Sequence, residues 1–239
     1  MRVSLKRLCR RRPRSAKQSS AVPRPTTVSV PTWDVAEANS TIEAPTRLVQ
    51  LTVGGSSQLW QRVGLSFDDH QTCQVGQVTL RLDQDVSLGH LGWAFDPIIS
   101  SIDEIPSTPR VSASELRPPD HQLVDHVVVM TDSLERTSSA IEECTGLELR
   151  RIRDASNGVR QAFHRSGEVV IEVVQTPSVT GPHLWGFVLV THPFDEVVSQ
   201  LGENVVSPPK DALQPGRRIA TVRRELGLGI NVALISPRQ

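Results

Sequence analysis

The sequence lacks most of the features that mark a membrane, secreted or disulfide-bonded protein. No run approaches the 18 apolar residues of a transmembrane helix, and no stretch near the start has the apolar core of a secretory signal. Its three cysteines, Cys9, Cys73 and Cys144, are far apart and form no C-x-x-C pair. We therefore expect no membrane partner, no disulfide and a cytoplasmic location.

Acidic residues are absent from positions 1–33, which makes the first segment strongly basic. Nine of the 26 basic residues lie between Arg2 and Arg24, so the remaining body has 17 basic against 26 acidic residues. A body with a charge near −9 repels nucleic acid, and we expect no nucleic-acid partner. Residues 1–45, rich in Pro, Ser and Thr, are expected to form a disordered tail, although their composition also resembles a transit peptide.

Motifs of several common enzyme classes are also missing. The sequence contains no G-x-S-x-G, Walker or G-x-G-x-x-G pattern, so it gives no support to a hydrolase, a nucleoside triphosphatase or a dinucleotide-binding enzyme.

The ordered part of the chain reads as short strands and helices in a repeating order. Before residue 105 the pattern predicts a strand, a short helix, a hairpin and a further strand, at 46–53, 56–64, 72–83 and 88–96. We interpret 46–104 as an incomplete βαβββ module and the Pro- and Ser-containing stretch 105–121 as a linker.

The same order returns twice between residues 122 and 237. The first copy has a strand at 124–131, a helix over 134–145 capped by Asp132 or Ser133 and stopped by Gly146, and strands at 147–154, 159–167 and 168–176. The second has a strand at 184–191, a helix at 194–202 and strands at 217–225 and 230–236. We predict an α+β fold in which tandem βαβββ modules form a curved mixed sheet, a cup suited to a small-molecule ligand.

One histidine and one carboxylate stand out within this pattern. Strand alternation places His126 on one face of its strand together with Val124, Val128 and Met130. On the later strand, Glu172 shares a face with Glu168, Val170 and Val174. If both faces line the cup, His126 and Glu172 converge in apolar surroundings, where a carboxylate is costly unless it is paired. A pair of this kind supports either acid–base chemistry or simple hydrogen bonding.

The stretch "VDHVVVMTDSLERT", the acidic residue at Glu172 and the two tandem βαβββ units resemble the vicinal oxygen chelate superfamily. Its members include glyoxalase I, extradiol dioxygenases and fosfomycin- and bleomycin-resistance proteins. More narrowly, "RQAFHRSGEVVIEVV", "LWGFVLV" and "LQPGRRIATVRRELGLGINVALISP" are similar to uncharacterised glyoxalase-like proteins. The resemblance covers 122–237 well and 46–104 in part.

This resemblance implies a divalent metal site with ligands from the first and fourth strands of each module. The first module offers His126 and Glu172, whereas the matching positions of the second module are Gly186 and Val232 or a neighbour of Val232, which are apolar or, at Asn231, a poor ligand. A site for Zn, Ni, Mn or Fe would therefore be degenerate or absent, unless His164 or a partner subunit completes it.

Further ligand-binding candidates come from the strands and loops around the expected cup. They are Arg160, Gln161, Trp185, Gln214, Arg217 and Arg223. Arginine suits a carboxylate or phosphate group, but the arginines of "QPGRRIATVRRE" also fit a charged, solvated strand edge. Trp185 equally fits core packing, and Gln214 fits a turn before Pro215.

The resulting hypothesis is a glyoxalase-like protein that binds a small metabolite in the cup with a degenerate or absent metal site. Two alternatives stay open. One is a metal-dependent lyase, isomerase or dioxygenase, and the other is a non-catalytic binding or sequestration protein. Because modules of this superfamily can pair across chains, the resemblance also allows a homodimer, and the oligomeric state stays open.

Overall fold

A computed structural model of the chain describes residues 45–155 and 158–238. These residues belong to one compact unit. The basic tail predicted at 1–45 lies, except for its last residue, outside the described residues. In the part that the structure describes, no helix is long and apolar enough to cross a bilayer.

An eight-stranded sheet contains both βαβββ modules, and it confirms the predicted α+β fold. The first module consists of β7 (His121–Thr131), α2 (Leu134–Thr145), β8 (Leu149–Asp154), β9 (Arg160–Ser166) and β10 (Val169–Gln175). The second consists of β11 (His183–Thr191), α3 (Phe194–Leu201), β12 (Lys210–Asp211), β13 (Arg218–Thr221) and β14 (Asn231–Ile235). The strand order is β12-β13-β14-β11-β7-β10-β9-β8.

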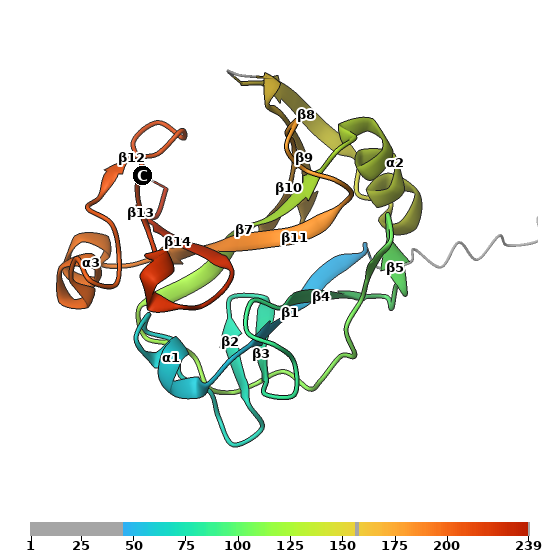
Figure 1. Cartoon of the computed structure of the whole chain (residues 1–239). Coiled ribbons are helices and arrows are strands. Elements are labelled where there is room, and N and C mark those ends of the chain that lie inside the picture. Colours follow the sequence, from blue (N-terminus) through green and yellow to red (C-terminus); the bar gives the residue numbers. More distant parts are fainter. Residues whose placement is uncertain (1–44, 156–157, 239) are drawn as a thin grey trace, which may run out of the picture. The chain divides into compact units, whose positions relative to one another are not determined.

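The two modules have the same internal pairing and meet along one seam. The first strand of each module runs parallel to its last strand, β7 beside β10 and β11 beside β14. The two first strands, β7 and β11, pair antiparallel with each other. Figure 1 shows the ends of this sheet, β8 and β12, bent toward the same side; we call that side the concave face.

The helix of the first module begins and ends as its sequence indicates. The hydroxyl of Ser133, not the carboxylate of Asp132, accepts the N-terminal hydrogen bond of α2, from the backbone amide of Arg136. Gly146 ends the helix in the left-handed conformation, with φ of 68°.

One strand prediction was partly wrong. The stretch predicted as a strand at 217–225 is a strand only over β13, and Arg224 lies in the short 3-10 helix η2 (Arg224–Leu226), which Gly227 ends. The two-residue strand β12 has too little sequence to show alternation, and no strand was predicted there.

A second, four-stranded sheet precedes these modules. It consists of β1 (Arg47–Gly54), β2 (Thr72–Val75), β3 (Val78–Asp83) and β4 (Leu91–Asp96), with α1 (Ser57–Gln61) after β1. Its order, β2-β3-β1-β4, repeats the module pattern with one strand fewer: β3 runs parallel to β1, and β4 pairs antiparallel with it, as β11 does with β7.

The stretch predicted as a linker, residues 105–121, is hydrogen-bonded to the part of the chain that contains the four-stranded sheet. It begins with β6 (Ile105–Pro106), which pairs with β5 (Ser101–Ile102). The side-chain amide of Gln50 then donates to the carbonyl of Pro109, and the hydroxyl of Ser114 donates to Asp68 over 2.6 Å. The segment therefore packs on its surroundings before β7 begins.

The core lies between the two sheets and around α2. Trp60 of α1 is fully buried and stacks on Phe187 of β11, with ring centroids 6.2 Å apart. Val124, Val127 and Val129 of β7 belong to the same core. Because Phe187 faces the core, its neighbour Val188 points to the concave face.

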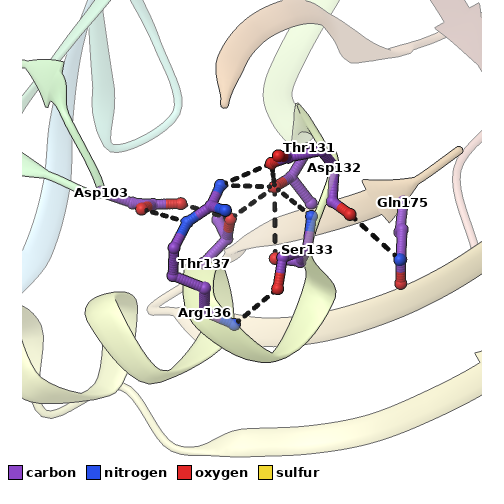
Figure 2. Close-up of polar contacts among 7 residues, drawn as sticks. All are labelled: Asp103, Thr131, Asp132, Ser133, Arg136, Thr137 and Gln175. Atoms are coloured by element: carbon purple, nitrogen blue, oxygen red, sulfur yellow. Dashed lines mark hydrogen bonds and ion pairs between the residues drawn. The ribbon is translucent and has the colours of Figure 1, made fainter. Parts of the chain in front are cut away.

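A polar cluster joins the β5–β6 turn to the start of α2 (Figure 2). Asp103 and Glu104 have positive φ angles of 44° and 66°. A two-residue hairpin loop with a type I′ turn requires a positive φ at both positions. The Asp103 carboxylate accepts from Arg136 Nε over 2.8 Å and from the hydroxyl of the buried Thr137. The cluster therefore fixes the hairpin against α2.

Replacing Asp103 with alanine should lower the free energy of unfolding by about 1–3 kcal/mol, because Arg136 and the buried Thr137 hydroxyl lose a charged acceptor and Thr137 keeps only Thr131 Oγ1, 2.8 Å away. Asp103→Asn, which suits a positive φ and retains a side-chain acceptor, should lose less. Urea unfolding measures both variants, and Asp132→Ala, which alters the exposed carboxylate on the same arginine, is the control. Equal losses for Asp103→Ala and Asp132→Ala would contradict the assignment.

Candidate functional site

His126 and Glu172 meet on the concave face. In the parallel pairing of β7 with β10, His126 lies opposite Val170 and Val128 lies opposite Glu172. The side chains of His126 and Glu172 are therefore two residues apart in register and on the same face. His126 Nε2 lies 3.4 Å from Glu172 Oε2, and each side chain is 14% exposed. The sequence-based expectation that these two residues converge is correct.

A β-bulge in β7 adds Asp125 to this site. Val188 of β11 pairs with His126 and the next residue, Leu189, pairs with Val124, so Asp125 is the extra residue on β7. The bulge allows the neighbouring side chains of Asp125 and His126 to bond with each other, Oδ2 to Nδ1 over 2.8 Å. It also places Val124 in the core, which corrects the expectation that Val124 shares a face with His126.

Asp125 is buried and doubly paired. Its Oδ1 accepts from Arg217 Nη1 over 2.6 Å, and its Oδ2 bonds to His126. Burial by itself would raise the pKa of Asp125, but the hydrogen bonds and positive charges of His126 and Arg217 outweigh it and lower the pKa to about 2. Asp125 is therefore a fixed negative charge at neutral pH.

Arg217 brings the second module into the same network. Only 3% of its side chain is exposed. Its Nη1 also donates to Gln214 Oε1 over 2.9 Å, and its Nε donates to the carbonyl of Ser236 over 2.7 Å. Gln214 and Arg217, proposed as ligand-binding residues from the sequence, are thus joined to the His126–Glu172 pair through Asp125.

On the side of Glu172 away from His126, Gln161 is the last residue of this polar network. Its Nε2 donates to Glu172 Oε1 over 2.6 Å. The polar network therefore runs in the order Gln161, Glu172, His126, Asp125, Arg217, Gln214. We call it the concave-face network, and it spans both modules.

Four predicted site residues lie elsewhere. His164 pairs with Ile171, which faces the core, and its Nδ1 bonds to the carbonyl of Leu147. Burial is the main cause that lowers the pKa of His164, so it is a neutral core residue. The remaining three make other contacts or face solvent: Arg160 pairs with Glu135, Arg223 donates to the carbonyl of Glu203, and Trp185 is 40% exposed.

The predicted third metal ligand is therefore wrong, for a simple reason of parity. His164 and Phe163 are neighbours on β9, and it is Phe163 that lies opposite Glu172. Successive side chains point to opposite faces of a sheet. The His164 side chain therefore points to the opposite face from the His126–Glu172 pair.

The remaining donors do not suit a divalent metal. Both oxygens of Asp125 and Nδ1 of His126 bond within the network, and Gln161 holds one oxygen of Glu172. His126 Nε2 and Glu172 Oε2 are left, fewer than the three protein ligands usual for catalytic zinc. Within residues 45–155 and 158–238, no group of three or more His, Cys, Asp or Glu side chains has the geometry of a metal site.

The second module offers no ligand in return. At Gly186 a Cβ would lie 2.0 Å from the backbone oxygen of Asn231, so the close β11–β14 pairing excludes any side chain there. Val232 is buried and belongs to the core. Both replacements expected from the sequence thus have a packing role.

Asp125 is the residue that sequence reasoning missed. Strict alternation assigns it to the face opposite His126, within a run of valines that forms the core. A carboxylate next to a histidine in such a run is costly to bury without a partner, and this cost was the available signal for a bulge.

Sequence comparisons find no matching protein-family model and no matching curated protein. Among solved structures, the chain is similar to a methylmalonyl-CoA epimerase from Mycobacterium tuberculosis, with 14% identity over 54% of this chain and 94% of that one and a TM-score of 0.43. It is also similar to a hypothetical protein from Bacillus halodurans, with 19% identity, 48% and 94% coverage and a TM-score of 0.42. A Streptomyces coelicolor methylmalonyl-CoA epimerase in complex with 2-nitronate-propionyl-CoA has 17% identity, 48% and 97% coverage and a TM-score of 0.40.

The strand order defines the fold independently of these scores. Two βαβββ modules, each with its first strand parallel to its last, are joined through their first strands into one curved sheet. Residues 121–235 therefore have the fold of the vicinal oxygen chelate superfamily, as the sequence resemblance implies.

Proposed function

We propose that the protein binds a small molecule on the concave face, with Glu172 and His126 as the polar contacts and without a resident divalent metal. The observation that carries the proposal is the 3.4 Å approach of His126 Nε2 to Glu172 Oε2 on that face. The concave-face network holds both side chains in place, because Gln161 hydrogen-bonds to Glu172 and Asp125 hydrogen-bonds to His126.

The surroundings of the pair favour a ligand with an apolar body. Val188, Val190, Ala233 and Ile235 form a second apolar cluster, separate from the main core. Val188 pairs with His126 across the seam, so this cluster lies next to the pair on the same face. A few placed polar groups beside apolar side chains are typical of small-molecule sites.

The pair also has the chemistry to move a proton. When His126 Nδ1–H donates to the Asp125 carboxylate, a hydrogen bond between Nε2 and Glu172 needs one more proton, on either the imidazole or the carboxyl group. Asp125 fixes the ring orientation, as the orienting group of an acid–base pair does. A ligand that contacts Nε2 or Oε2 would exchange a proton there without any metal.

A screen of small carboxylates, carbonyl compounds and thioesters by thermal shift tests the proposal. A ligand present at 100 times its Kd should stabilise the wild-type protein by about 2.7 kcal/mol. Glu172→Gln and His126→Gln should abolish this shift, whereas Glu143→Gln, a change on the exposed face of α2, should retain it. Product analysis of the same mixtures separates catalysis from binding without turnover.

Two outcomes contradict the proposal. A ligand whose shift survives both Glu172→Gln and His126→Gln would place binding elsewhere. Stoichiometric micromolar binding of Zn²⁺, Ni²⁺, Mn²⁺ or Fe²⁺ that His126→Ala abolishes would overturn the metal-free part and favour the metal-dependent alternative.

A further inference from the structure

A separate hollow of about 260 Å³ opens where the two modules meet the end of the chain. It adjoins the concave-face network at Asp125 but is not lined by His126 or Glu172. Its walls include Leu123, Asp125, Arg165, Val190, Arg217 and Arg238. Three arginines from three different segments therefore converge on one hollow.

One of these arginines has an unused donor. The Arg217 side chain is 3% exposed, and its Nε and Nη1 are bonded to Ser236, Asp125 and Gln214. Its Nη2 is buried and has no hydrogen-bond partner in the described part of the chain. Buried guanidinium donors are almost always satisfied, so an unpartnered one on a residue that lines a hollow favours binding of an acceptor in that hollow.

The charge of the hollow favours an anion. The oxygens of Asp125 already accept from His126 and Arg217. Arg165 and Arg238 are exposed and have no ion-pair partner among residues 45–155 and 158–238, and Glu168 is the one other acid in the wall. The two exposed arginines thus outnumber the single free carboxylate.

The position of Arg165 shows why it faces this region. In the antiparallel pairing of β9 with β10 it lies opposite Val170, which in turn lies opposite His126 on β7. Residues that pair across strands share a face. Arg165 therefore projects from the same concave face as His126, two strands away.

From this geometry we infer that the hollow is an oxyanion subsite that binds a phosphate or carboxylate group. Planar guanidinium groups bind both kinds of group through paired hydrogen bonds. A volume of about 260 Å³ is below the roughly 300–1,000 Å³ of sites for whole drug-sized ligands, so it fits one charged group. The subsite does not depend on the proposed role of Glu172 and His126.

Titration with sodium phosphate, at an ionic strength held constant with sodium chloride, tests the subsite in the full-length protein. We expect saturable binding by calorimetry, with shifts of the Leu123 and Val190 amide signals in NMR spectra. Arg165→Gln and Arg238→Gln, both at exposed positions, should each weaken binding roughly tenfold, the equivalent of one charged hydrogen bond. Glu168→Gln should strengthen binding, because it removes the repelling carboxylate.

The controls separate this inference from the proposed function. Arg151→Gln, an exposed arginine on β8, should leave phosphate binding unchanged. Glu172→Gln should also leave it unchanged, although it abolishes binding at the His126–Glu172 pair. Sodium acetate in place of phosphate determines whether a single carboxylate is enough, and saturable binding of either anion supports the subsite.

The absence of saturable binding with both anions would overturn the inference. So would phosphate binding that Arg165→Gln and Arg238→Gln leave intact, because it would identify an adventitious ion only.

Discussion

Replacing Trp60 with alanine should lower the free energy of unfolding by about 3–5 kcal/mol, the usual cost of truncating a buried tryptophan. Trp60 is fully buried, stacks on Phe187, and donates from its indole nitrogen to the carbonyl of Gly54 over 2.9 Å. The substitution removes the contact that joins α1 to β11, together with a buried hydrogen bond.

Trp185 provides a matched control for this experiment. It lies only two residues before Phe187 on β11 but is 40% exposed, so Trp185→Ala should change stability by about 0.5 kcal/mol or less. Urea unfolding followed by circular dichroism measures both variants, because replacing tryptophan alters fluorescence. Similar losses for the two variants would show that α1 does not pack on β11 as described.

Asp125→Ala should lower the free energy of unfolding by about 3–5 kcal/mol, as much as Trp60→Ala, but for an electrostatic reason. The substitution leaves the guanidinium of Arg217 buried beside an empty position, and uncompensated buried charges carry penalties of this size. Asp154→Ala, at a carboxylate whose side chain is 82% exposed, should have little effect.

A double variant identifies the cause of that loss. Asp125→Ala combined with Arg217→Met removes both charges, so it should be more stable than Asp125→Ala alone. If the double variant is instead less stable by the sum of both single losses, the two residues do not interact and the network is wrong.

The pH dependence provides an independent measurement of the same contact. Pairing lowers the pKa of Asp125 from the ordinary 3.8 to about 2 in the folded protein. A lowered carboxylate pKa contributes stability that is complete above the unfolded value and disappears as the pH falls through the folded one. The wild-type protein should therefore lose this contribution between about pH 4 and pH 2, and Asp125→Ala should lack that part of the decline.

The sequence predicted the architecture because the relevant signals are local and repeated. Alternation identified β7, β10 and β11, and the serine and glycine at the ends of α2 fixed its bounds to within a residue. The meeting of His126 with Glu172 was expected on the condition that both strand faces line the cup, and the two side chains do lie 3.4 Å apart. The division into domains at residues 104 and 121 stays a prediction.

The errors in assigning side chains to a face of the sheet arose where a shift of one residue reverses the direction in which the side chains point. A single extra residue at Asp125 moved Val124 to the core and created the link to Arg217. His164 was chosen for its chemistry, although strand parity turned it away from Glu172. Gln161 and Gln214 were proposed individually, but their connection through four other side chains depends on tertiary pairing that no local pattern encodes.

The seam between β7 and β11 limits how a ligand of the proposed kind could reach the concave face. Because main-chain hydrogen bonds join the modules there, the two halves cannot swing apart about a hinge as separate lobes do around their cargo. A ligand of the proposed kind would therefore have to bind to a surface whose two halves are held together as one continuous sheet.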